Sequence, residues 1–390
     1  MVLALAVVSA VLSFVLALII RRYSLKNKVA LQAPREGRDI HVKATSRLGG
    51  AAIVLSFLII MIVLVAIYHD KGPVDLGFPF KIFGVAIDKR LLGIILATVF
   101  LSAVMLRDDF KGIAPYWKLL AQIFAAVLLI LTGVGITYLN NPFGLAIPLD
   151  TVKIPIQIGA DIFNFVLWAD LFFIAWVVLL TNATNFIDGL DGLAASLSAV
   201  AGIILVFLSL KMGQDATALL AAVFAGVIIG LLPLNLPLNA PRSLAMPARS
   251  FQRRWGGGGA AKIFLGDTGS MFLGLMLAIL TVISGGKLAT VLLVFGLVII
   301  DALYVVLKRL IKGKNPLTTP DQSHLHHRFL RAGFTPTMSL ISITLLSLSF
   351  GLAGLLTAGK LKIILIAVLA LFSLVLFTLL DLVGKKKLTN

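Results

Sequence analysis

The sequence predicts an all-α membrane protein with about eleven transmembrane helices, and three observations carry this prediction. Hydrophobic residues make up 59% of the 390 residues and the mean hydropathy is +1.06, well above what soluble domains show. Apolar runs of about twenty residues, the length that crosses a bilayer as a helix, recur along the whole chain. Basic residues concentrate in alternate segments between these runs. There are no cysteines, which excludes disulfides, thiolate nucleophiles and zinc–thiolate sites.

We expect a single integral-membrane domain over residues 1–390, with the N-terminus outside and the C-terminus in the cytoplasm. The expected spans lie near 2–20, 48–68, 91–106, 118–138, 164–181, 193–210, 216–232, 268–284, 288–307, 338–358 and 361–383. The first run has no basic segment before it, and its positive charges follow it. This arrangement is typical of an uncleaved anchor rather than of a signal peptide.

The distribution of Lys and Arg supports this topology. With the N-terminus outside, the inner segments hold 25 of the 34 basic residues and the outer segments hold nine. This is the bias that the positive-inside rule describes, so the net charge of +17 belongs mostly to one face. Lys385, Lys386 and Lys387 lie on that face and suit anionic headgroups. We therefore expect a multi-pass protein of the inner (cytoplasmic) membrane, with lipids rather than nucleic acid against its basic face.

The stretch 181–193 carries the strongest site signal. Four polar side chains recur every third residue and form a slowly drifting stripe in helical geometry: Asn182, Asn185, Asp188 and Asp191. Gly189 and Gly192 then allow the backbone to approach a ligand closely. A helix end leading into a polar loop would explain one Asn and one Gly, but hardly four polar groups in register. Because ionisable groups beside a membrane span are costly and usually functional, we interpret this stretch as part of a site.

Two adjacent carboxylates follow the third expected span. Asp108 and Asp109 converge on one ligand only at a helix end or turn, because neighbouring helical residues point about 100° apart. They repel each other unless a cation neutralises them, which Mg²⁺ held between carboxylates and phosphate oxygens would do. The alternative is an ordinary acidic loop countered by Arg107 and Lys111.

Asp267 lies at the expected start of the eighth span, within the stretch 266–270. Glycines flank it and hydroxyls follow at 268 and 270, a pattern typical of a helix N-terminus with free backbone N–H groups. Such a terminus can bind phosphate or present Asp267 to a bridging metal ion. Simple capping by Asp267 or Thr268 is the alternative, and it leaves the rest of the cluster unexplained.

Three of the five histidines lie within four residues after the ninth expected span: His324, His326 and His327. A buried transition-metal site is one interpretation, but thiolates are absent and the other motifs offer oxygen ligands. With Arg328 and other basic residues nearby, we favour a phosphate-binding cluster, to which a histidine could add proton transfer. Exposed imidazoles on a loop are the remaining alternative.

Two weaker signals complete the set. Basic residues, including Arg47, lead into Gly49-Gly50 at the start of the second span and fit an anion site no better than a solvated basic loop. Asp301 lies inside the ninth span, where a carboxylate is costly. We expect it to form a structural pair with a cation from the inner face rather than to have a chemical role.

Together these motifs resemble one family, the polyprenyl-phosphate N-acetylhexosamine-1-phosphate transferases, whose superfamily includes the phospho-MurNAc-pentapeptide transferase MraY. The resemblance runs in order over most of the chain, from His41 and Gly49-Gly50 to the motif that begins at His324. The patterns Asn-x-x-Asn-x-x-Asp-Gly-Leu-Asp-Gly and Leu-Gly-Asp-x-Gly-Ser are specific, whereas the Asp pair is less so. The form His-Leu-His-His-Arg resembles the UDP-GlcNAc branch, such as the initiators of O-antigen and teichoic-acid linkage synthesis.

The resemblance implies transfer of a sugar 1-phosphate, here GlcNAc-1-phosphate, from a UDP-sugar to undecaprenyl phosphate, with Mg²⁺ or Mn²⁺ bound and UMP released. It implies metal binding by Asp109 and Asp267, and orientation or deprotonation of the lipid phosphate by Asp108. The implied catalytic set is Asp108, Asp109, Asp188, Asp191 and His324. The implied substrate-binding set is Arg47, Asn182, Asn185, His326, His327 and Arg328. The active site would lie on the cytoplasmic face.

The chain departs from the family at several positions. Gly112 stands where a third Asp is common, the stretch 44–46 replaces Pro-Thr-Pro, and Asp39 replaces a common Lys. The segment 233–261 is longer than the usual connection. Its Pro-, Arg- and Gly-rich composition predicts a mobile cytoplasmic insert.

The alternatives are an MraY-like phospho-MurNAc-pentapeptide transferase, a secondary transporter, and a membrane scaffold without catalysis. Transporters place polar residues near the midplane and carry repeats in their two halves. Here the motifs cluster at inner helix ends, and no repeat is visible in the sequence. The sequence is compatible with an oligomer.

Overall fold

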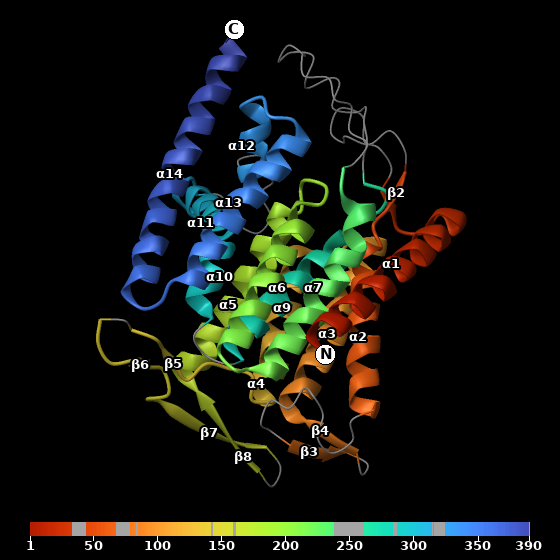
Figure 1. Ribbon diagram of the computed structural model, residues 1–390, viewed down its shortest axis with the longest axis vertical. Helices are drawn as coiled ribbons and strands as arrows, with labels where there is room; N and C mark the ends of the chain where they lie inside the picture. Colours follow the sequence, from red (N-terminus) through yellow and green to blue (C-terminus); the bar gives the residue numbers. More distant parts are fainter. Residues whose placement is uncertain are drawn as a thin grey trace.

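The computed structural model describes residues 1–32, 44–67, 79–82, 85–141, 143–158, 161–237, 261–283, 287–313, 315 and 324–389. Its helices form one bundle, with short strand pairs at the two ends (Figure 1). The helices in the first half of the chain are α1 Val2–Asn27, α2 Gly49–Ile67, α3 Lys89–Lys111, α4 Pro115–Leu131, α5 Leu167–Ile187 and α6 Leu193–Lys211. Those in the second half are α7 Asp215–Asn235, α9 Gly266–Val282, α10 Leu288–Val294, α11 Gly296–Ile311, α12 Leu325–Arg331, α13 Pro336–Leu356 and α14 Lys360–Thr389.

The strands form antiparallel pairs that the all-α prediction did not include. The pairs are β1 Leu31–Gln32 with β2 Thr45–Ser46, β3 Pro79–Ile82 with β4 Val85–Asp88, β5 Tyr138–Leu139 with β6 Ile147–Pro148, and β7 Lys153–Ile158 with β8 Asp161–Val166. The end of β8 covers residues 164–166, where the fifth span was expected to start, so α5 starts at Leu167, three residues later than predicted. The strands lie in the connections between helices and leave the helical class of the bundle unchanged.

The structure confirms a polytopic helical membrane protein. Among the described residues, eight helices are long and apolar enough to cross a membrane, and α10 with α11 adds a ninth if this pair, bent by 79°, is one span. The helices α4 and α9 are apolar but shorter, with 17 residues each. Each of the eleven expected ranges contains a helix. The count of eleven membrane crossings therefore stays a prediction.

The connections expected on opposite sides lie at opposite ends of the bundle. Figure 1 shows β2, α12 and the C-terminus at one end, and the strand pairs from β3 to β8 at the other. The first end is the one at which the polar motifs were expected, and we call it the motif end. Which end faces the cytoplasm is a prediction from the basic residues.

The helix α9 lies at the centre of the bundle, packed against α2, α3 and α5. All of its side chains are buried except that of Asp267, which is partly buried at its first turn. In its last turn, Thr281 Oγ1 accepts a hydrogen bond from Trp176 Nε1 on α5 at 2.9 Å. Because a helix buried on all sides cannot shift without disrupting several contacts, α9 holds its N-terminus firmly at the motif end.

Candidate active site

The carboxylate of Asp109 binds the N-terminus of α9. Asp109 Oδ1 accepts a hydrogen bond from the backbone N–H of Asp267 at 2.8 Å. Asp109 Oδ2 accepts from the backbone N–H of Thr268 at 3.0 Å and from Thr268 Oγ1 at 2.6 Å. The sequence predicted that this helix terminus would bind a phosphate or present Asp267 to a metal ion, with simple capping as the alternative. In the structure, the anion at these N–H groups is a carboxylate from α3, which fixes α3 to α9.

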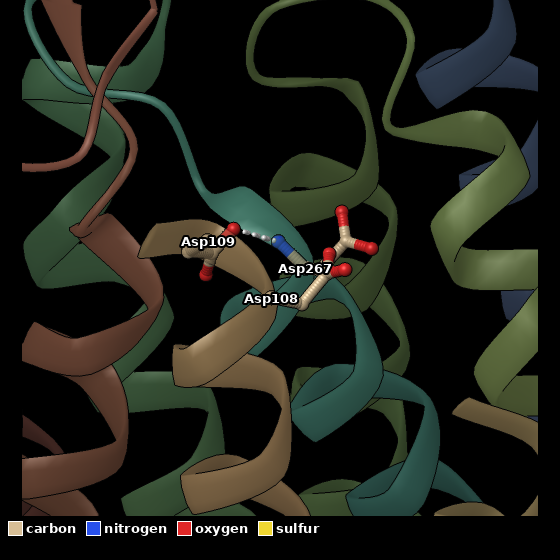
Figure 2. A group of neighbouring side chains, drawn as sticks. All are labelled: Asp108, Asp109 and Asp267. Atoms are coloured by element: carbon tan, nitrogen blue, oxygen red, sulfur yellow. Dashed lines mark hydrogen bonds between the residues drawn. The ribbon is translucent and has the colours of Figure 1, made fainter. Parts of the chain in front are cut away.

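Asp108 lies beside the side chain of Asp267, and one ammonium bridges the two carboxylates. Lys118 Nζ lies 2.7 Å from Asp108 Oδ2 and also pairs with Asp267 Oδ2. Asp108 Oδ1 accepts from the backbone N–H of Ile113 at 2.7 Å. Figure 2 shows the carboxylates of Asp108 and Asp267 side by side, with Asp109 turned to the Asp267 backbone nitrogen. One oxygen from each of the three carboxylates lies within 4.8 Å of the others, so together they could hold a metal ion.

The turn between α3 and α4 positions this group. The helix α3 ends at Gly112, whose φ of 70° lies in the left-handed region that glycine adopts without strain. Pro115 then begins α4 with a fixed φ that suits the first helical position. Asp108 and Asp109 thus occupy the last turn of α3, as the spacing predicted, and Lys118 the first turn of α4. The third Asp common in the family is replaced by the residue that makes this turn.

Arg47 brings a second cation to the group from the segment before α2. Its Nη2 lies 3.4 Å from Asp109 Oδ1 and 3.5 Å from Asp267 Oδ1. Among the described residues, three carboxylates therefore face two cations. The side chain of Arg47 is 32% exposed and that of Asp109 is fully buried. The ion pair therefore joins a partly exposed cation to a buried carboxylate.

The Gly49-Gly50 pair serves backbone packing, not the weak anion site that the sequence offered. The N–H of Gly49 donates to Phe264 O at 2.9 Å and that of Gly50 to Leu265 O at 2.7 Å. A Cβ on Gly50 would lie 2.1 Å from the backbone nitrogen of Gly269. The N–H groups are therefore used inside the protein, and the first segment is held directly against the start of α9.

The polar stripe of 181–193 lies along the end of α5 and the turn to α6. Asn182 Nδ2 donates to Gln122 Oε1 on α4 at 2.7 Å. Asn185 Nδ2 donates to Ser270 Oγ on α9 at 2.9 Å. Asp191 Oδ2 accepts from the backbone N–H of Ala261 at 3.0 Å. The stripe therefore holds α4, α9 and the lead-in to α9 together at the motif end.

Asp188 caps α5 and lies within the field of the acidic group. Burial raises the pKa of Asp188 well above its usual range, and the charges of Asp267, Asp191 and Asp109 raise it further, while Arg47 opposes them. Negatively charged carboxylates that lie close together favour a bound cation. The structure thus brings the stripe and the Asp pair together, as the sequence predicted.

The histidine motif forms the start of α12 and faces the turn after α5. His326 is 2% exposed and packs on Gly189, where an added Cβ would lie 2.4 Å from its Nε2. Burial lowers the pKa of His326 well below 6.5, so this ring is neutral at pH 7. The ring of His324 is parallel to that of His326 at 6.3 Å, and the ring of His327 is 4.1 Å from that of His326. The alternative of exposed imidazoles is wrong for His324 and His326, because both are buried.

Arg328 is turned away from the acidic group. Its Nη1 pairs with Asp381 on α14, and its guanidinium carbon lies 4.8 Å and 5.0 Å from the ring centroids of Tyr304 and Phe377. Arg328 is 1% exposed. In this arrangement it holds α12 to α14, which differs from the diphosphate contact that the resemblance implies.

Some residues around the site were not singled out from the sequence. In the sequence, we counted Lys118 only among the basic residues of an inner segment. Lys118 is ten residues from Asp108, and this spacing does not predict a contact unless the turn between α3 and α4 is known. Asp381 follows an apolar run and has no motif around it. Asp301 was expected to pair with a cation, and its partner is His324. Asp39, His41 and residues 238–260 of the expected insert lie outside the described residues. The first residues of the expected insert, 233–235, belong to α7.

Comparison with known proteins identifies the family. Residues 91–285, half of the chain, match the sequence model described as Glycosyl transferase family 4. The chain belongs to glycosyl transferase family 4. The matched range contains Asp108, Asp109, the polar stripe and Asp267, so it includes the acidic part of the site. Arg47 and the histidine motif lie outside it.

The similarity to individual relatives covers more of the chain than the family model does. A Bacillus subtilis (strain 168) protein named "Probable undecaprenyl-phosphate N-acetylglucosaminyl 1-phosphate transferase" is 25% identical, over 97% of this chain and 92% of its own length. A decaprenyl-phosphate N-acetylglucosaminephosphotransferase of Mycolicibacterium smegmatis is 28% identical, over 81% of this chain and 72% of its own length. A phospho-N-acetylmuramoyl-pentapeptide-transferase of Staphylococcus carnosus is 24% identical, over 91% of this chain and 98% of its own length.

Proposed function

We propose that this chain transfers GlcNAc-1-phosphate from UDP-GlcNAc to undecaprenyl phosphate, releases UMP, and thereby starts a lipid-linked glycan of the cell envelope. The observation that carries the proposal is the convergence of Asp108, Asp109 and Asp267 with Arg47 and Lys118 at one end of apolar helices. The names of the Bacillus and Mycolicibacterium relatives, which specify an undecaprenyl or decaprenyl phosphate and N-acetylglucosamine, support it.

The chemistry of the transfer explains this residue set. An oxygen of the lipid phosphate attacks the phosphorus next to the sugar, and the bond from that phosphorus to the bridging oxygen breaks. UMP leaves with the bridging oxygen, and the sugar phosphate is joined to the lipid phosphate. Two polyanions must meet for this to happen, so catalysis consists mainly of positioning and charge neutralisation. Cations and a metal site at a helix end beside the bilayer provide both.

The acidic group fits Mg²⁺ or Mn²⁺. Its donors are carboxylate oxygens, which these hard cations prefer, and one oxygen of each lies within 4.8 Å of the others. Lys118 Nζ between Asp108 and Asp267 shows that positive charge is favoured there. Asp267 with Asp109 would hold the ion, which when bound offsets the charge of the diphosphate and of the leaving phosphate. The side chain of Asp109 is fully buried and bound to backbone N–H groups, whereas that of Asp267 is 17% exposed, so Asp267 is the more available ligand.

The other residues surround this centre. Asp108, beside Lys118, would orient or deprotonate the lipid phosphate. The stripe, consisting of Asn182, Asn185, Asp188 and Asp191, would contact the nucleotide or the metal shell. The histidines of α12 would contact the diphosphate and sugar. Arg328 would contribute by holding α12 in place, because its guanidinium is buried against Asp381.

The same proposal includes the topology. We propose a single domain with eleven crossings in the inner membrane, the N-terminus outside, and the motif end with the C-terminus in the cytoplasm. The placement of 25 of the 34 basic residues in the expected inner segments supports this sidedness. The lipid acceptor could then reach the acidic group laterally between helices.

A second candidate is the MraY-like reaction, in which the donor sugar carries a peptide. The Staphylococcus carnosus relative supports it, since this chain covers 98% of that protein. The match to the His-Leu-His-His-Arg form favours the GlcNAc reaction. A secondary transporter is disfavoured because the titratable groups of the site gather at one end of the bundle.

The deciding experiment offers a panel of donors to the purified protein. It is incubated with undecaprenyl phosphate, Mg²⁺ and one of UDP-GlcNAc, UDP-GalNAc, UDP-glucose or UDP-MurNAc-pentapeptide, and UMP release is followed. We expect UMP with UDP-GlcNAc above all. Release only with UDP-MurNAc-pentapeptide would favour the second candidate. No UMP from any donor would contradict the proposal.

A further inference from the structure

Asp301 on α11 and His324 before α12 form a buried pair outside the acidic group. Asp301 Oδ2 lies 3.0 Å from His324 Nδ1, and the residues are 2% and 5% exposed. They are 23 positions apart, so the fold makes the contact. Within the part of the chain that the structure describes, Asp301 Oδ1 has no hydrogen-bond partner. The imidazole therefore supplies a hydrogen bond to a carboxylate that would otherwise be costly to bury.

The pair determines how the ring of His324 can be used. A buried ionised carboxylate needs a donor, and Nδ1–H is the donor that the geometry provides. The other ring nitrogen, Nε2, lies across the ring and remains for a further partner. A carboxylate behind a functional histidine fixes its ring orientation and tautomer.

The ring of His324 lies next to the turn that carries the polar stripe. It is 5.1 Å from the ring of Phe186, two residues before Asp188. The ring of His324 is also parallel to the ring of His326, which packs on Gly189. His324 is therefore held between α11 and the turn after α5, at the motif end.

We infer that Asp301 is a positioning residue, which holds His324 by Nδ1 and presents Nε2 to a phosphate oxygen of the sugar nucleotide. The inference rests on the proposed function and adds to it a carboxylate from a helix that carries no motif. It differs from a structural ion pair in one respect: the effect of Asp301 on turnover must pass through His324.

A double-mutant cycle tests this dependence. The four proteins are wild type, Asp301→Asn, His324→Asn and the double variant, and kcat and KM for UDP-GlcNAc are measured with the thermal midpoint of each. The amide in His324→Asn keeps a donor near the Nδ1 position and removes Nε2. We expect Asp301→Asn to lower kcat/KM about tenfold to hundredfold, the range for carboxylates that orient metal-binding histidines. In the His324→Asn background the same change should alter kcat/KM less than about twofold.

Asp170→Asn is the matched control, because Asp170 is a buried carboxylate of α5 whose Oδ2 accepts from the backbone N–H of Val166 at 2.7 Å. It should leave kcat/KM within about twofold of wild type. Equal losses from Asp301→Asn in both backgrounds would overturn the inference, as would a loss that follows only the amount of folded protein. If Asp301→Asn does not fold, Asp301→Glu replaces it: reduced turnover at an unchanged midpoint supports the inference, and wild-type turnover contradicts it. If the wild type releases no UMP, that result contradicts the proposed function itself rather than this inference.

Discussion

The acidic group at the start of α9 and the histidine group on α12 lie at the same end of the bundle, but their polar atoms are satisfied differently. In the acidic group, Asp108, Asp109 and Asp267 face the cations of Lys118 and Arg47, and Asp109 also accepts backbone N–H groups. In the histidine group the situation is reversed. Basic side chains are held by single carboxylates from other helices, Asp301 for His324 and Asp381 for Arg328.

The difference indicates that the two groups have different roles. The acidic group has an excess of negative charge that a divalent cation and a polyanionic substrate can share, so its groups are available for chemistry. The histidine group is buried, and its contacts with α5, α11 and α14 determine where the rings lie. Changes in the first group should therefore act on rate and metal dependence, and changes in the second on geometry and stability.

The largest effect is expected from Asp267→Asn. It removes the more available carboxylate ligand and should lower turnover by about 10²–10³-fold, with partial recovery at high Mg²⁺. UMP release titrated with Mg²⁺ measures both effects. Asp150→Asn, a half-exposed carboxylate in an outer connection, is the control and should behave as wild type. Near-normal activity of Asp267→Asn with unchanged Mg²⁺ dependence would remove Asp267 from the metal site.

Lys118→Met should lower turnover by about 10–10²-fold and change metal demand in the opposite direction. Without the ammonium, Asp108 and Asp267 carry more uncompensated charge, so less Mg²⁺ should be needed for half-maximal activity. The same titration reads this out. Exposed Lys111→Met, from the last turn of α3, is the control. An increased Mg²⁺ requirement in Lys118→Met would contradict the assignment of Lys118 as a counter-charge.

Gly189→Ala tests the contact between the two groups. Its Cβ would lie 2.4 Å from His326 Nε2, and the buried ring would have to move. We expect about a tenfold loss of turnover, equivalent to about 1.4 kcal/mol. Gly135→Ala is matched, because a Cβ there meets no atom within 4 Å. Wild-type turnover in Gly189→Ala would show that the position of His326 is unimportant for the reaction.

Arg328→Gln should act on stability more than on rate. Breaking a fully buried ion pair costs about 3–5 kcal/mol, but the Asp381 side chain is 37% exposed, so we expect about 1–2 kcal/mol. The thermal midpoint in detergent and turnover per folded molecule separate the two effects. Arg331→Gln, which removes the more exposed contact to Asp381 at 3.3 Å, should change the midpoint less. A midpoint equal to wild type in Arg328→Gln would contradict the role of this pair in holding α12.

The smallest effect concerns pH. Burial lowers the pKa of His326 well below 6.5, so below pH 6.5 the unfolded chain takes up a proton that the folded chain does not. Stability from this residue is therefore complete above pH 6.5 and falls as pH decreases toward the lowered pKa, by up to about 1.4 kcal/mol per pH unit. Thermal midpoints from pH 7.5 to 5.5 should decline more in wild type than in His326→Gln. Equal declines would show that His326 is not kept neutral by the fold.

Much of this arrangement could be predicted from the sequence. Long apolar runs gave the helices, since a span needs about twenty residues whatever its neighbours are. Asp108, Asp109 and Asp267 were found because residue types that suit a metal and phosphate stood at helix ends. The use of Asp109 could not be predicted, because a carboxylate that caps a helix and one that binds a metal have the same local pattern.

The remaining differences have the same cause. The pairs of Asp301 with His324 and Asp381 with Arg328 join residues 23 and 53 positions apart, and only the packing of α11, α12 and α14 brings them together. The all-α prediction overlooked a strand pattern in β7, where Ile154, Ile156 and Ile158 alternate with other residue types, whereas strands of two residues, such as β5 and β6, are too short to show a pattern. Gly49-Gly50 fitted an anion site weakly, but the segment 264–269 packs against these glycines and accepts hydrogen bonds from their N–H groups.

The central claim is that phosphate travels with the sugar, and an isotope label tests it directly. UDP-GlcNAc carrying ³²P only in the phosphate next to the sugar is incubated with the purified protein, undecaprenyl phosphate and Mg²⁺, and the lipid and aqueous products are separated. We predict that the label enters the lipid product in equal amount to the GlcNAc, and that UMP is released unlabelled. Label that remains in water-soluble UDP while GlcNAc enters the lipid would show transfer of the sugar alone and would contradict the account.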